Sequence, residues 1–90
     1  MAAKTVEFRV TADNNLRYWL AVDDKDLPLV NGVGKVSLDG EHILYWWMVG
    51  NSGDGLGIVG MQGNKPAVMV KRSEIPSGST KAGGFRRFTV

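Results

Sequence analysis

The chain has 90 residues, of which 22% are charged and 43% are hydrophobic, and its formal net charge is +2. This composition excludes a disordered chain, and the length predicts a single domain, residues 1–90, with one modest core. Cysteine is absent, which excludes disulfides and thiolate metal sites. We find no signal-peptide pattern and no apolar run long enough to cross a bilayer, so we expect a cytoplasmic protein with no membrane contact.

Glycines divide the chain into short segments that are rich in β-branched and aromatic residues and lack a sustained helical period. This spacing predicts an all-β protein. Strands are expected at residues 4–11, 16–22, 33–38, 42–49, 56–61, 66–72 and 85–90. About seven short strands with tight turns favour a two-sheet antiparallel β-sandwich, and a small β-barrel is the alternative.

The first two predicted strands alternate apolar and polar residues, which is typical of strands with one buried face. In the first of them Val6, Phe8 and Val10 share a face. The link at residues 12–15 suits a tight turn, because Asn and Asp tolerate left-handed backbone conformations. We therefore expect these two strands to pair as a hairpin. In the second strand, Trp19 falls on the polar side and is expected to point outward.

The dipeptide Asp39-Gly40 lies between the third and fourth predicted strands, and Asp-Gly favours a two-residue hairpin turn. In that register the core face would consist of Val36, Ile43, Tyr45, Trp47 and Val49. The opposite face would then carry Leu44, Trp46 and Met48. A three-residue loop with a bulge would exchange the two faces, but both faces of the segment EHILYWWMVG, residues 41–50, would still be apolar.

The segment VSLDGEHILYWWMVGNSGDG, residues 36–55, resembles the hairpin and glycine loop of immunoglobulin-like and transthyretin-like β-sandwich modules. The resemblance covers about a fifth of the chain and implies the sandwich architecture alone. No functional residue follows from it.

Outward tryptophans are the clearest candidates for ligand contact, because indole rings stack on sugar rings and nucleobases and bury large areas in interfaces. The predicted faces make Trp19, Trp46, Leu44 and Met48 the contact residues. We expect a non-enzymatic β-sandwich domain that binds a protein partner or itself. One alternative is a carbohydrate-binding module that uses the outward tryptophans, and another is a weak nucleic-acid binder that uses the basic C-terminal region.

Basic side chains concentrate near the end of the sequence. Residues 71–90 carry five basic side chains and one acidic side chain, whereas residues 1–70 carry six basic and eight acidic side chains. The candidate basic patch consists of Lys71, Arg72, Arg86 and Arg87. Solvated charge of this kind also protects edge strands from aggregation, so the sequence disfavours nucleic acid as a partner.

Strict alternation of strand direction would place the links after the second, fourth and sixth predicted strands at one end of the molecule. The polar residues of two of these links form a candidate loop-end site: Asp23, Asp24, Asp26, Asn51 and Asp54. They offer oxygen ligands for calcium, but they lack EF-hand spacing and turn chemistry accounts for them, so no metal site is predicted. The third link contains a Gly- and Ser-rich segment, residues 76–84, which we expect to be a flexible loop.

Residues 55–60 match the G-x-G-x-x-G fingerprint, which binds dinucleotides only where a helix follows it. The next residues, 61–66, include Gly and Pro and cannot form that helix, so no cofactor is predicted. His42 is the only histidine, and no motif supplies it with a catalytic partner. We therefore do not expect an enzyme.

Overall fold

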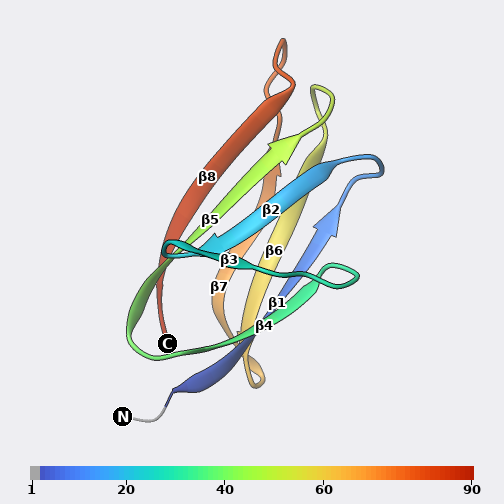
Figure 1. Cartoon of the computed structure of the whole chain (residues 1–90). Helices are drawn as coiled ribbons and strands as arrows, with labels where there is room; N and C mark the ends of the chain where they lie inside the picture. The colour runs from blue at the N-terminus through green and yellow to red at the C-terminus, as the bar shows by residue number, and fades with distance from the viewer. Residues whose placement is uncertain (1–2) are drawn as a thin grey trace.

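The computed structural model describes residues 3–90 and contains eight strands and no helix among them (Figure 1). Their bounds are β1 (Lys4–Ala12), β2 (Arg17–Val22), β3 (Lys25–Leu27), β4 (Val33–Leu38), β5 (Glu41–Val49), β6 (Gly55–Gln62), β7 (Lys65–Glu74) and β8 (Lys81–Thr89). They form two antiparallel sheets with the strand orders β4-β1-β6-β7 and β3-β2-β5-β8. The predicted two-sheet β-sandwich is confirmed.

All seven predicted strands are present, and the structure adds the short strand β3. The last strand also starts earlier than expected, because Lys81–Gly84 belong to β8 and pair with β5. The Gly- and Ser-rich link is therefore confined to residues 75–80. Small residues at the start of β8 follow from packing, since a Cβ added to Gly84 would lie 2.5 Å from the Trp46 ring. At Gly83 and Gly84 the absence of a side chain therefore reflects a close approach within a sheet and not a loop.

Neither of the two predicted hairpins exists. β1 lies between β4 and β6 in one sheet, whereas β2 lies between β3 and β5 in the other. The link at Asp39-Gly40 likewise passes from one sheet to the other, with Gly40 at a φ of 84°. A left-handed turn residue reverses the chain equally well within a sheet and between two sheets, so turn chemistry did not distinguish them. Within residues 3–90 the tight hairpins are β2–β3 and β6–β7.

The prediction that three long links share one end of the molecule is also wrong. β3 adds one reversal of chain direction, so every later strand runs opposite to the predicted direction. Asp23 consequently lies beside Ile43 near the start of β5, and Asn51 follows the end of that strand. Residues 50–54 and 75–80 do meet, because the Gly53 amide donates to the Ile75 carbonyl at 2.9 Å.

The faces of β5 are the reverse of those predicted. Leu44, Trp46 and Met48 are 0%, 5% and 1% exposed and belong to the core, while Trp47 is 49% exposed. The pairing with β2 explains this, because Trp46 lies opposite the buried Leu20 and Trp47 lies opposite the exposed Trp19. The Trp46 ring also donates from Nε1 to Ser73 Oγ in the other sheet, at 3.0 Å. One tryptophan therefore packs between the sheets, and its neighbour points to solvent.

The two adjacent tryptophans should differ strongly in their contribution to stability. We expect Trp46→Ala to lower the free energy of unfolding by about 3–5 kcal/mol, because it leaves a cavity in the core and removes a hydrogen bond. Trp47→Ala should lower it by less than about 1.5 kcal/mol, since it loses only half-exposed ring contacts. Urea unfolding of both variants measures this, and equal losses would contradict the observed orientation of β5.

Candidate functional site

Four aromatic side chains gather on the outer surface of the β3-β2-β5-β8 sheet. We call this surface, formed by Trp19, Tyr45, Trp47 and Phe85, the aromatic face. Trp19 pairs directly with Trp47, and Tyr45 pairs directly with Phe85 across the next strand boundary. The Tyr45 ring centroid is 6.1 Å from that of Trp47, with 18° between the planes, and 6.2 Å from that of Phe85. The rings of Trp19, Trp47 and Phe85 are about half exposed.

The aromatic face holds every aromatic side chain that the core does not use. The chain has three Trp, two Tyr and three Phe residues. Phe8, Trp46 and Phe88 are buried, and Tyr18 packs against the core. The outward positions of β1, β4, β6 and β7 carry no aromatic side chain. The two outer surfaces of the sandwich therefore differ in their chemistry, although both are antiparallel sheets.

Basic side chains border the aromatic face. Arg17 and Lys81 both pair with Val49, one row beyond the pair of exposed tryptophans. Arg87 pairs with Ile43, one row beyond Tyr45 and Phe85. Within residues 3–90 none of these three cations forms an ion pair. Acidic residues lie there as well: Asp26 is on the edge strand β3, Glu41 is at the start of β5, and Asp23 lines an open hollow together with Glu41 and Arg87.

The structure leaves one of the four predicted contact residues on the surface and places the other three in the core. Trp19 is 52% exposed, as predicted, but the prediction that Leu44, Trp46 and Met48 face outward is wrong, because all three are core residues. Sequence reasoning missed Tyr45, Trp47 and Phe85, which take their place on the outer surface. The sequence did contain one signal. Glu41 lies on the same face of the strand as Tyr45 and Trp47, because side chains alternate, and a glutamate favours the solvent side for that face.

The four residues of the predicted basic patch do not lie together. Lys71 is on the outer surface of the β4-β1-β6-β7 sheet, whereas Arg87 is on that of the other sheet. Arg86 donates from Nη1 to the Met69 carbonyl at 2.6 Å and so links the edge strands β8 and β7. Arg72 is engaged by two carboxylates, those of Asp13 and Glu74.

Arg72 fastens the links at one end of the sandwich. Its guanidinium lies 2.8 Å from Asp13 Oδ2 and also donates to the Gly53 carbonyl at 3.1 Å. The same Asp13 carboxylate accepts a hydrogen bond from the Gly55 amide at 3.0 Å. The hydrogen bond from Arg72, followed by that from Gly55, lowers the pKa of Asp13. Arg72 is therefore part of a structural network and is not a free cation.

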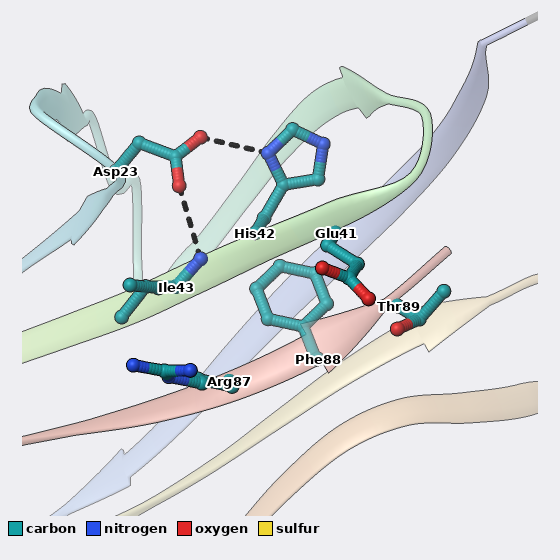
Figure 2. A pocket seen from close by; sticks show the side chains of 7 residues that line it. All are labelled: Asp23, Glu41, His42, Ile43, Arg87, Phe88 and Thr89. Carbon is teal, nitrogen blue, oxygen red and sulfur yellow. Dashed lines mark hydrogen bonds and ion pairs between the residues drawn. The ribbon is translucent and has the colours of Figure 1, made fainter.

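The predicted loop-end residues divide between the two ends of the sandwich. At one end, Asp23 accepts hydrogen bonds from His42 Nδ1 at 2.7 Å and from the Ile43 amide at 3.0 Å, as Figure 2 shows. Asp24 is exposed in the same turn, and Asp26 lies on β3. At the other end, the backbone N–H of Asn51 donates to Asp54 Oδ2 at 3.0 Å and closes a local turn. They therefore form no single site.

His42 and Asp23 line an open hollow of about 500 Å³ together with Arg87, Phe88 and Thr89 (Figure 2). His42 Nε2 lies 2.9 Å from the Asp39 carbonyl, so both ring nitrogens face acceptors. In its protonated form the imidazole can donate to both acceptors, and the hydrogen bond to Asp23 raises the pKa of His42. Asp23 in addition adopts a left-handed backbone, with a φ of 57°, and its amide bonds the Ile43 carbonyl. This geometry ties the β2–β3 turn to β5.

Sites of other kinds find little support in the fold. Among residues 3–90 no cluster of three or more His, Cys, Asp or Glu side chains is placed to hold a metal ion. The G-x-G-x-x-G segment lies within β6 and leads into β7, so no helix N-terminus follows it. The described part of the chain includes no helical segment with the length and apolar character needed to cross a membrane.

Comparison with known proteins supplies no relative from which a function could be transferred. No family model, no curated protein and no solved structure matches this chain.

The pair of His42 and Asp23 predicts a pH dependence of stability. The hydrogen bond between the two side chains raises the pKa of His42 and lowers the pKa of Asp23. The stabilisation from His42 is therefore complete below the unfolded-state pKa of about 6.5 and is lost as the pH rises through its folded-state pKa. The stabilisation from Asp23 is present above its unfolded-state pKa and is lost in acid.

We expect His42→Gln to destabilise the protein more at pH 5 than at pH 9, in urea unfolding of the variant and the parent chain at both values. Lys71→Gln, a change on the opposite sheet, serves as a control and should show no such difference. A loss that is equal at both pH values would mean that the ring contributes packing alone.

Proposed function

We propose that this chain is a non-enzymatic binding domain and that the aromatic face is its contact surface. The observation that supports this is the segregation of the aromatic residues. Those that the core does not use all lie on one outer surface, where three of the four rings are about half exposed. Clustered exposed apolar side chains with a charged rim are typical of interaction sites.

Folding alone does not account for these rings. A cross-strand pair such as Trp19 and Trp47 stabilises a sheet by about 0.2–1 kcal/mol, a contribution that Thr or Val pairs also supply. Exposed indoles, by contrast, leave a large apolar area accessible to solvent, and this favours association with another surface or ring. The arrangement is therefore better explained by contact with a ligand or partner chain than by the stability of the monomer.

The three tryptophans offer a direct test by nuclear magnetic resonance, because each gives one indole N–H signal. The Trp46 signal comes from a buried ring that is bonded to Ser73, so it serves as an internal reference. We expect the Trp19 and Trp47 signals to move on binding, while the Trp46 signal stays in place. The probes are a thymidine oligonucleotide, a cello-oligosaccharide, and the protein itself in a concentration series.

The outcome separates binding at this face from binding elsewhere. If one probe moves the signals of Trp19 and Trp47 and the Trp47→Ala variant no longer binds it, the aromatic face is the contact surface. Met69→Ala is the matched control, since Met69 is 45% exposed on the outer surface of the opposite sheet. Failure of every probe and of self-association to move either signal would count against the proposed function.

A further inference from the structure

The charges around the aromatic face indicate which occupant it fits. Arg17 and Lys81 lie one row from the exposed tryptophans, a distance of about 7 Å along the strands. Glu41 lies three rows from Trp47 on the same strand, at about 20 Å. Along β2, β5 and β8 the charges nearest to the tryptophan pair are therefore positive, and within residues 3–90 they form no ion pair. Asp26 on the edge strand β3 is an acidic neighbour of Trp19, so the positive charge lies on the β5–β8 side of the pair.

We infer that the aromatic face binds single-stranded nucleic acid, an inference that rests on the proposed function. Proteins that bind single strands combine aromatic side chains, on which bases stack, with cations that follow the phosphate backbone. Here Trp19, Trp47, Tyr45 and Phe85 offer the rings, and Arg17, Lys81 and Arg87 offer the cations. A duplex keeps its bases stacked inside and cannot place them on these rings.

The strand β8 has the arrangement that such a ligand needs. Its outward positions read Lys81, Gly83, Phe85 and Arg87, so a ring lies between two cations. Gly83 pairs with Trp47 and places no side chain beside that indole. Trp47 Cδ1 would lie 3.4 Å from a Cβ at position 83, so the half-exposed indole rests over this bare backbone. A base can stack on the exposed side of the indole, with Lys81 one row away for a phosphate.

Other occupants fit the charges less well. A neutral glycan would use the rings but would leave three unpaired cations without a counterpart. A second copy, packed face to face with the same strand ends together, would bring Arg17 and Lys81 of both chains close to one another, where like charges cost free energy. The sequence disfavoured nucleic acid because basic side chains such as those of the C-terminal region also protect edge strands from aggregation. The sheet brings Lys81 and Arg87 of that region, and Arg17, to the same surface as the rings.

Fluorescence anisotropy of a labelled thymidine dodecamer tests the inference. We expect Trp47→Ala and Phe85→Ala to weaken binding by about 5- to 100-fold each, because each loses one stacked base. Trp47→Phe should restore part of the affinity. The logarithm of the binding constant should fall with the logarithm of salt concentration with a slope of about −2, as three cations imply.

Charge variants separate the two contributions. Lys81→Gln and Arg17→Gln should each reduce the size of that slope by about 0.7, whereas Lys71→Gln and Met69→Ala on the opposite sheet should change neither slope nor affinity. A duplex of the same length should bind more weakly than the single strand. Urea unfolding of each variant verifies that it is folded.

The inference is overturned if the dodecamer does not bind, or if it binds with the same affinity to Trp47→Ala, Phe85→Ala and the parent chain. If the cello-oligosaccharide or self-association moves the Trp19 and Trp47 signals while the dodecamer does not, the occupant is wrong but the proposed function stands. If none of the three moves them, both the occupant and the proposed function are rejected.

Discussion

The inward orientation of Trp46 is the constraint on which the rest of this structure depends. Its ring fills the space between the sheets, lies against the bare backbone of Gly84 and donates a hydrogen bond to Ser73 of β7. Because side chains alternate along a strand, fixing Trp46 inside also fixes Tyr45 and Trp47 outside. β5 pairs with both β2 and β8, so it sets the register of Trp19 and Phe85 as well. The aromatic face therefore follows from one buried indole.

Much of the fold could be predicted from local patterns, and the remainder depended on contacts between distant residues. Alternation and glycine spacing located seven strands and the sandwich, because both features are properties of a single segment. They did not determine which strands pair. The turn residues at 12–15 and at Asp39-Gly40 suit a link between sheets as well as a hairpin. The three residues of β3 were too few to show a period, yet they reverse the direction of everything that follows.

The candidate site was predictable in part, for the same reason. Alternation within β2 alone places Trp19 outside, and the structure agrees. The faces of β5 could not be assigned in this way, because both parities are apolar and the assignment required the correct partner strand. The structural ion pairs could not be predicted from the sequence at all. His42 and Asp23 are 19 residues apart, and Arg72 and Asp13 are 59 apart, so only the tertiary fold reveals that these side chains are engaged.

The two outer surfaces of the sandwich differ in how their charged side chains are paired. On the β4-β1-β6-β7 sheet, Glu7 is held by Arg9 and Lys35, so these opposite charges neutralise one another, while Lys71 forms no ion pair within residues 3–90. On the other sheet Arg17, Lys81 and Arg87 have no such partners, and rings occupy the positions between them. An unpaired cation beside an exposed ring contributes little to folding, because water solvates the charge and the ring remains half wet. The same cation and ring favour binding of a ligand that carries both an anionic group and a flat ring. Such a ligand removes the cation and the ring from water at the same time. Under the binding function that we propose, the two sheets differ because one surface is complete in the free protein and the other is completed by its ligand.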